Sequence, residues 1–552
     1  MRSTLLSFAL LAALCGCAHA DDPSRSAASA ADASTAHPLD LSEADVAGLQ
    51  ARMASGQSSS LQLTRAYLQR IAGIDRAGPR LNAVIELNPQ AEADARALDA
   101  ERKAGHVRGP LHGIPVLLKD NIDALPMVNS AGSLALAEFR PARDAFVVQR
   151  LRTAGAVILG KTNLSEWANF RSTQSSSGWS GRGGLTRNPY ALDRNPCGSS
   201  AGTGAAIAAS LATVGIGTET DGSITCPASV NGLVGLKPTV GLVSRDGIIP
   251  ISASQDTAGP MTRSVADAAA VLQAIAAPDP QDPATAKAPA TSVDYLAHLK
   301  PDSLRGARLG LLRNPLREDP AIAAVLDRAV RTLRDAGATV VETALATDGK
   351  WDAAEQMVLL VEFKAGLNAY LQNHHAPVAN LEQLIAFNRK HAQREMPYFG
   401  QELFEQAQGA PGLDDAGYLS ARQRQAIGGA GRHRRSLEGR SPGCLDRAHD
   451  GRGVDHHTRQ GRYLPRRRLW CRGGGRLSKP ERTDGTDQGL ATGPVVHGHG
   501  LERAAPDRAG VCIRATQPCA LYAWLCAECA GCARWGHVRH DTRRACARFA
   551  PA

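Results

Sequence analysis

Long apolar runs are scarce in this chain of 552 residues. After residue 20 no stretch approaches the ~20 largely apolar residues that a membrane-spanning helix needs, which excludes a polytopic membrane protein. Aromatic residues make up only 4% of the sequence, but 43% hydrophobic and 21% charged residues are typical of globular proteins. The composition therefore predicts one large domain, or two to three of ordinary size.

Cysteine is almost absent from the middle of the chain. Of the 12 cysteines, eight follow residue 428 and two, Cys15 and Cys17, lie in the first twenty residues, which leaves only Cys197 and Cys226 between them. Two cysteines cannot build a disulfide scaffold, so the fold must be stabilised by a buried apolar core.

An excess of basic residues is also missing from residues 1–427, which carry 40 basic and 42 acidic side chains. The net charge of +10 comes from residues 428–552, where 22 Arg and one Lys face 11 acids. A nucleic-acid binder is therefore not indicated for the main part of the chain.

The first twenty residues have the pattern of an export signal. Arg2 provides a positive start, residues 5–14 are apolar, and residues 18–20 read Ala-His-Ala, the small-x-small form that signal peptidase cleaves. We expect a signal peptide over residues 1–20, a polar linker over 21–40, and a periplasmic or secreted protein.

A lipoprotein is the alternative. Leu14-Cys15-Gly16-Cys17 approximates a lipobox, in which Cys17 would be acylated and would anchor the protein to a membrane surface. The unusual Cys15 makes simple export the favoured interpretation.

Short apolar runs alternate with helical patterns along the central part, which predicts an α/β layered domain. The expected strands are residues 114–118, 156–159, 211–216, 233–236, 309–312 and 339–342, and the clearest expected helices are residues 143–153, 265–275 and 324–333. Residues 353–408 are expected to be mainly helical.

Motifs for two common chemistries are missing. The Gly/Ser-rich segment 197–204 lacks the Gly-Lys-Ser/Thr ending of a phosphate-binding Walker loop. Between residues 41 and 360 the only histidines are His106, His112 and His298, none in a context typical of a Ser-His-Asp site. Lys119, directly after an apolar run, is a better candidate base, because a buried lysine can become neutral and accept a proton.

Four segments together resemble the amidase signature family. They are residues 113–123, 198–204, 217–227 and 232–239, and their order and spacing are similar to the family over about residues 41–427. The resemblance implies one α/β domain built on a central mixed β-sheet with helices on both faces. It also implies a Ser-cis-Ser-Lys site, with Ser223 as nucleophile, Ser199 as the bridging serine after a cis peptide bond, and Lys119 as base.

The chemistry implied by this resemblance is acyl transfer. Neutral Lys119 would take a proton from Ser199, which takes one from Ser223, and Ser200 would support the bridge by hydrogen bonding. The oxyanion hole is predicted at the backbone N–H groups of four residues. These are Thr220, Asp221, Gly222 and Ser223. No metal and no organic cofactor is implied.

Within the family, three segments are most similar to bacterial peptide amidases. They are residues 217–224, 167–171 and 241–250, and they imply hydrolysis of C-terminal peptide amides with release of ammonia. The alternative is an amidase for small amides, or an esterase, on the same site. The export signal counts against a role as a subunit of a tRNA-linked amidotransferase, because that enzyme works in the cytoplasm. We expect a monomer with no nucleic-acid partner.

Cys197 and Cys226 flank the two serines, which must lie close together in this scheme. Either a disulfide, in an oxidising compartment, or two buried thiols would fit, and two buried thiols are the favoured interpretation.

The composition changes after about residue 427. Arg replaces Lys, Cys and His become frequent, and hydrophobic periodicity disappears. We interpret residues 428–552 as a frameshifted, non-native tail, because Ala and Gly codons of a GC-rich gene read out of phase give Arg, Pro, Cys and His. A metal site at Cys526, Cys529 and Cys532, or a nucleic-acid arm, is a weaker alternative.

A frameshift would remove the segment that, in the family, completes the sheet and one wall of the substrate cleft. The exposed apolar surface would cost stability that a marginally stable fold cannot spare. We therefore expect the chain as written to be unstable or inactive and its parent protein to be the active amidase.

Overall fold

A computed structural model of the chain describes residues 39–312, 320–343, 352–426, 443–445 and 496–497. Residues 1–39 form a unit of their own, of which Leu39 alone is described, and the rest of this section concerns the unit 40–552. The predicted signal peptide, Cys17 and nearly all of the predicted tail, with Cys526, Cys529 and Cys532, lie outside the described residues. No helix in the described ranges is long and apolar enough to cross a membrane.

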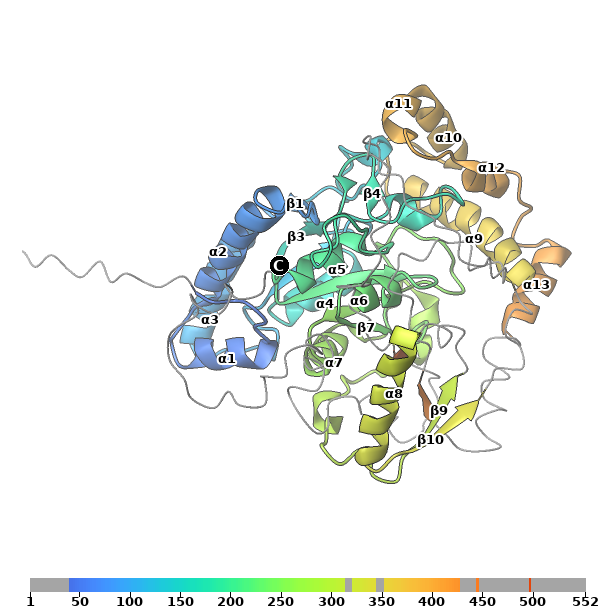
Figure 1. The fold of residues 1–552 in the computed structure, drawn as a ribbon. Coiled ribbons are helices and arrows are strands. Elements are labelled where there is room, and N and C mark those ends of the chain that lie inside the picture. The colour runs from blue at the N-terminus through green and yellow to red at the C-terminus, as the bar shows by residue number, and fades with distance from the viewer. Residues whose placement is uncertain (1–38, 313–319, 344–351, 427–442, 446–495, 498–552) are drawn as a thin grey trace, which may run out of the picture. The chain divides into compact units, whose positions relative to one another are not determined.

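A seven-stranded mixed sheet forms the centre of this unit (Figure 1). In spatial order its strands are β1 (Val84–Leu87), β3 (Val157–Thr162), β2 (Pro115–Lys119), β6 (Val214–Glu219), β8 (Thr257–Thr262), β7 (Val234–Lys237) and β12 (Val496–His497). Strands β3, β2 and β6 run parallel to one another, whereas β1 pairs antiparallel with β3, and β8 pairs antiparallel with both β6 and β7.

The three parallel strands are buried along their whole length. Strands covered on both faces carry near-continuous apolar runs rather than an alternating pattern, which is why β2, β3 and β6 were recognisable in the sequence. Lys119 at the end of β2 and Lys161 in β3 break this apolar pattern, although neither side chain is exposed. A charged group at such a place is expensive unless it is paired or neutral.

Helices cover both faces of the sheet (Figure 1). Helix α5 (Ala201–Ala208) packs on β2, β3, β6 and β8, and α6 (Thr225–Val230) packs on β7. Helix α7 (Val265–Ile275) packs on β7 and β8 and contacts α4 (Phe146–Thr153), while α2 (Ser60–Arg70) and α3 (Ala91–Lys103) pack on β2 and β3. Helix α1 (Val46–Ala54) precedes them and begins at the N-cap Asp45.

A smaller parallel sheet contains β9 (Arg308–Leu312), β10 (Thr339–Thr343) and β11 (Gly443–Leu445). Helix α8 (Pro320–Asp335) packs on β10, so β9, α8 and β10 form the strand–helix–strand unit that the sequence pattern predicted. The core of this unit consists of aliphatic side chains. These are Leu304, Leu309, Val330, Leu333, Ala338 and Val340.

Residues 353–408 are mainly helical, as expected, and a further helix follows them. The helices are α9 (Asp352–Asn373), α10 (Leu381–Lys390), α11 (Ala392–Glu395), α12 (Glu402–Gln408) and α13 (Ala416–Ala426). Helices α12 and α13 both pack on α9 (Figure 1). The remaining short elements are the hairpin β4 (Trp179–Ser180) and β5 (Gly184–Leu185), the π-helix Ile71–Arg76, and the 3-10 helices Leu134–Leu136, Glu166–Asn169, Pro283–Lys287 and Leu296–His298.

The predicted fold class is confirmed, with shifts at several element ends. Strand β6 begins at Val214 rather than at residue 211, and α4 begins at Phe146 rather than at residue 143. No strand was expected after residue 428, whereas β11 and β12 add to the edges of β9 and β7. The unpaired backbone groups of an edge strand accept a short added strand whatever its side-chain pattern, so periodicity could not reveal these two.

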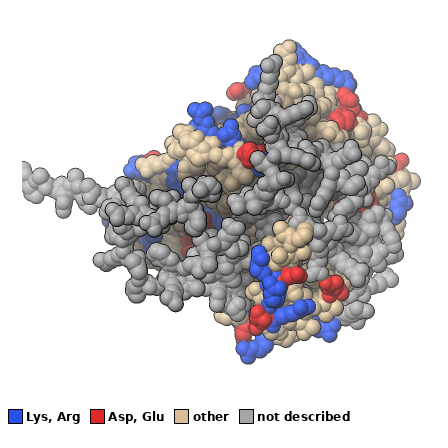
Figure 2. Space-filling view, in the orientation of Figure 1, with Lys and Arg blue, Asp and Glu red and all other residues tan. Residues whose placement is uncertain are grey.

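Charges of both signs are interspersed over the described part of the face shown in Figure 2. This agrees with the near balance of basic and acidic residues in residues 1–427. The predicted domain of residues 41–427 spans α1 to α13, and its boundaries remain predictions.

Candidate active site

Lys119 ends β2 with its ammonium nitrogen inside the protein. Its Nζ lies 2.7 Å from Ser199 Oγ, 2.9 Å from Thr218 Oγ1 and 3.1 Å from the Thr218 carbonyl oxygen. Complete burial lowers the pKa of Lys119 from 10.5 to about 7, although the negative charges of Glu219 and Asp256 oppose the shift. A substantial fraction of Lys119 is therefore neutral near pH 7, as a general base must be.

Ser199 and Ser200 lie directly before helix α5. The peptide bond between Gly198 and Ser199 is cis, as the family resemblance implied. Ser200 donates its backbone N–H to the Ser223 carbonyl at 3.1 Å, which joins the two serine segments. The Ser200 hydroxyl lies 3.2 Å from the Thr218 carbonyl, so its support acts through β6 rather than through Ser199 directly.

Ser223 lies on the loop between β6 and α6, and it lines the same cavity as Ser199. Among the described contacts there is no hydrogen bond between the hydroxyl groups of Ser199 and Ser223. The relay between these two hydroxyls therefore stays a prediction, and such contacts commonly tighten only when substrate binds.

The side chain of Glu219, at the end of β6, fixes the nucleophile loop, residues 220–224. Its carboxylate accepts the backbone N–H groups of Gly222 at 3.0 Å, Ile224 at 2.7 Å and Thr225 at 2.9 Å. The predicted oxyanion donor Gly222 is thus engaged by Glu219 in this structure. The oxyanion hole at Thr220, Asp221, Gly222 and Ser223 stays a prediction.

Three site residues were not identified from the sequence. Thr218 binds Lys119 and also accepts a hydrogen bond at 3.0 Å from Asn121, and Asp256 accepts one at 2.6 Å from Thr220 Oγ1. Thr218 and Asn121 belong to segments that carried the family resemblance. The sequence around a polar residue in a loop or strand does not indicate which side chain it will hydrogen-bond to. Asp256 precedes β8, in a part of the sequence with no recognised motif.

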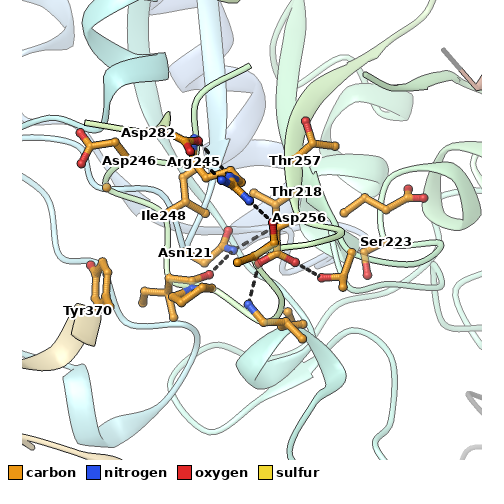
Figure 3. A pocket seen from close by; sticks show the side chains of 18 of the residues that line it. Asn121, Thr218, Ser223, Arg245, Asp246, Ile248, Asp256, Thr257, Asp282 and Tyr370 are labelled. Atoms are coloured by element: carbon orange, nitrogen blue, oxygen red, sulfur yellow. Dashed lines mark hydrogen bonds and ion pairs between the residues drawn. The ribbon is translucent and has the colours of Figure 1, made fainter. Parts of the chain in front are cut away.

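The cavity beside the serines has a volume of about 230 Å³ (Figure 3). All three segments that resembled peptide amidases contribute to it, through residues 218–220 and Ser223, through Ala168, and through residues 245–250. Its wall combines apolar Ile248, Ile249 and Ile251 with polar groups such as Tyr370. This is a cleft able to hold an amide next to Ser223, the predicted nucleophile, with an apolar group beyond it.

Cys197 and Cys226 form a disulfide, with their Cα atoms 6.0 Å apart. The favoured interpretation of two buried thiols is therefore wrong. The bond joins the residue two before Ser199 to the residue three after Ser223, because the close approach of the two serine segments also brings these cysteines together.

The described residues contain no group of three or more His, Cys, Asp or Glu side chains arranged to hold a metal ion. The groups around the serines are instead a buried lysine, hydroxyls and backbone amides. That donor set fits proton transfer and acyl transfer.

A family model described as Amidase matches residues 62–428. The chain is 60% identical to the peptide amidase from Stenotrophomonas maltophilia in its crystal structure, with a TM-score of 0.70 and coverage of 71% of this chain and 80% of that one. It is 54% identical to a peptide amidase in complex with the competitive inhibitor chymostatin, with a TM-score of 0.73 and coverage of 76% and 90%. It is also 42% identical over 387 residues to a "Probable amidase" of Arabidopsis thaliana, over 68% of this chain and 74% of that protein.

Proposed function

Because the chain belongs to the amidase signature family, we propose that it hydrolyses C-terminal amides of peptides with release of ammonia. At the coarser level it is a hydrolase of carbon–nitrogen bonds in linear amides. The observation that carries the finer proposal is the 2.7 Å contact between Lys119 Nζ and Ser199 Oγ beside Ser223, in a cleft partly formed by the peptide-amidase-like segments.

The proposed reaction begins with proton transfer. Neutral Lys119 takes the proton of Ser199, Ser199 takes the proton of Ser223, and Ser223 Oγ attacks the amide carbonyl carbon. Backbone N–H groups of the nucleophile loop stabilise the oxyanion that forms. The same relay returns a proton to the leaving nitrogen, ammonia departs, and water then hydrolyses the acyl-enzyme.

Two observations support a peptide substrate over a small amide. The relatives at 60% and 54% identity are peptide amidases, and one of them binds the competitive inhibitor chymostatin. The cleft also continues beyond the serines along residues 245–251 and Tyr370, which provides room for the residues before the amide. A small-amide amidase or an esterase on the same site is the competing function.

The test compares the release of ammonia from an N-acetylated dipeptide amide and from benzamide with the release of p-nitrophenolate from a p-nitrophenyl ester. We expect the dipeptide amide to have the highest kcat/KM, internal peptide bonds to stay intact by mass spectrometry, and Ser223→Ala to lose all activities. Ser55→Ala, which changes an exposed serine at the end of α1, is the matched control and should retain full activity. Faster turnover of benzamide or of the ester would overturn the peptide assignment.

We also propose that the protein is exported, as its N-terminal sequence predicts. The disulfide between Cys197 and Cys226 supports an oxidising compartment, because such bonds are rare in reducing cytosol. Fractionation of producing cells tests this, with labelling by a radioactive fatty acid to detect acylation at Cys17. Recovery of the uncleaved chain from the cytosol would contradict export.

For residues 428–552 we propose a shift of reading frame. The family match ends at residue 428, at the position where the composition changes. High-accuracy sequencing of the DNA across codons 410–440 decides the matter. If a base is missing or extra, its correction should restore a family-like C-terminal segment. An intact frame, together with clear amide hydrolysis by the 552-residue chain, would overturn both the frame shift and the expected inactivity.

A further inference from the structure

Asp256 is a carboxylate in the wall of the cavity that the proposed reaction does not use. It lies directly before β8, half-buried in the wall of the cavity (Figure 3). Its two oxygens accept three hydrogen bonds, from Thr220 Oγ1 at 2.6 Å and from the backbone N–H groups of Ile251 at 2.8 Å and Ser252 at 2.9 Å.

These three donors belong to two different walls. Thr220 starts the loop that leads to Ser223, whereas Ile251 and Ser252 belong to the segment 245–253 that lines the cavity. Ser252 in turn donates its hydroxyl to Glu362 of α9 at 2.6 Å, which anchors this second wall to the helical region. Asp256 is therefore the side chain through which the nucleophile loop is tied to the second wall.

We propose that Asp256 is a positioning residue that fixes the nucleophile loop against the cavity wall of residues 245–253. The inference rests on the proposed function, because it assigns a role in the same reaction. Asp256 acts through Thr220 on the loop and through two backbone N–H groups on the wall. Charge-assisted hydrogen bonds to a carboxylate are stronger than neutral ones, so one residue can hold both segments.

The negative charge of Asp256 gives the proposal a second measurable consequence. Asp256 and Glu219 are the charged groups that act on Lys119, and both raise its pKa against the effect of burial. Burial raises the pKa of the Asp256 carboxyl, although its three hydrogen bonds and the positive charge of Arg245 oppose the shift. An Asp256→Asn change keeps the size of the side chain but removes the charge, so it should lower the pKa of Lys119 below about 7.

Three variants of the full chain separate positioning from simple stability. Thr220→Val removes only the bond to the loop and Asp256→Asn also removes the charge. Asp267→Asn changes another buried carboxylate, which accepts the Val46 N–H at 3.0 Å and does not line the cavity. All three should lower Tm by comparable amounts, because each weakens hydrogen bonds to a carboxylate.

The kinetic result should distinguish them. We expect Thr220→Val and Asp256→Asn each to lower kcat on the dipeptide amide about 10-fold or more with KM changed less than about twofold, since a misplaced loop affects the reaction more than binding. Thr220→Ser should restore kcat. Of the three variants, Asp256→Asn alone should shift the acidic limb of the plot of kcat/KM against pH to lower pH. Asp267→Asn should change neither kcat nor the position of this acidic limb.

Hydrogen–deuterium exchange of residues 219–225 gives a measurement that does not need turnover. Exchange should rise in Thr220→Val and Asp256→Asn but not in Asp267→Asn. If neither the chain as written nor the parent protein with its reading frame restored releases ammonia, the proposed function fails, while exchange still decides the role of Asp256. Wild-type kcat in the first two variants of an active chain, or unchanged exchange in an inactive one, would overturn the proposal.

Discussion

Two regions of the molecule use burial in opposite ways. At the end of the large sheet the buried side chains include Lys119, Thr218, Glu219 and Thr220. Lys119 hydrogen-bonds to Thr218, Glu219 accepts backbone N–H groups, and Thr220 donates to Asp256. In the β9–α8–β10 unit the buried side chains are aliphatic, and none of the polar ones in residues 304–312 and 320–343 is buried.

This difference in the kind of side chain that is buried indicates the role of each region. Aliphatic burial contributes stability at about 25 cal/mol per Å² and requires no exact partner. A buried lysine next to hydroxyls costs stability, and such arrangements persist where a perturbed pKa is useful. Removal of the buried amine of Lys119 should thus lower activity without lowering stability, and truncation of a side chain in the aliphatic unit should lower stability without lowering activity.

Lys119→Met is the sharpest way to test the first half of this contrast. It removes the proposed base but fills the same buried space, so activity on peptide amides should fall roughly 1000-fold or more. Tm at pH 7 should not fall by more than about 2 °C, since an unfavourably buried amine has been removed. Calorimetry and ammonia release measure the two effects, and a large drop in Tm with residual activity would refute the contrast.

Removal of the disulfide by Cys197→Ala with Cys226→Ala should affect both quantities. The bond closes a segment with a sequence separation of 29, and a loop of that size corresponds to about 3 kcal/mol of stability. Because both ends lie beside the serines, kcat should fall together with the free energy of unfolding. Urea unfolding and kinetics on the same samples would show this, and an unchanged kcat would mean that the serines are held by other contacts.

Leu333→Ala tests the aliphatic unit. Leu333 is a buried residue of α8 in the small core formed with Leu309 and Val340, so the change should cost about 2–3 kcal/mol in unfolding free energy. The kcat of the folded fraction should stay at the wild-type value. A loss of kcat in fully folded protein would show that the two regions are coupled and would break the comparison.

The same contrast explains what could be predicted from the sequence. Strands β2, β9 and β10 were recognised because a buried strand or a strand–helix–strand unit has an apolar pattern along its own length. Lys119 was a candidate base because of its place after an apolar run, but Ser199 and Ser223 were recognised only through the four segments that resemble a family. Without that resemblance the two serines would have been read as ordinary loop residues.

The remaining site features depend on partners far apart in the sequence. Asp256 is 36 positions from Thr220, and the disulfide partners are 29 apart, so no local pattern contains either pair. Glu219 belongs to a segment that carried the family resemblance. Its hydrogen bond from the Gly222 N–H, however, depends on the conformation of the loop rather than on residue types. Loop conformation and long-range pairing are thus the two parts that one sequence did not provide.

The pH dependence of kcat/KM has the smallest expected effect and tests the electrostatic half of the comparison. Burial lowers the pKa of Lys119 to about 7, and the base works only when deprotonated. Below about pH 7 the activity should therefore fall about 10-fold per pH unit, and above it the activity should level off.

The stability linked to Lys119 has a definite sign. Its pKa is lower in the folded state than the value of 10.5 expected when unfolded, so between about pH 7 and 10.5 the unfolded chain binds more protons. This group's contribution to the unfolding free energy should rise with pH across that window. Lys119→Met should remove the rise, whereas Leu333→Ala should shift the stability curve down without changing its slope. A wild-type kcat/KM that is flat between pH 5 and 8 would mean that Lys119 does not act as the base.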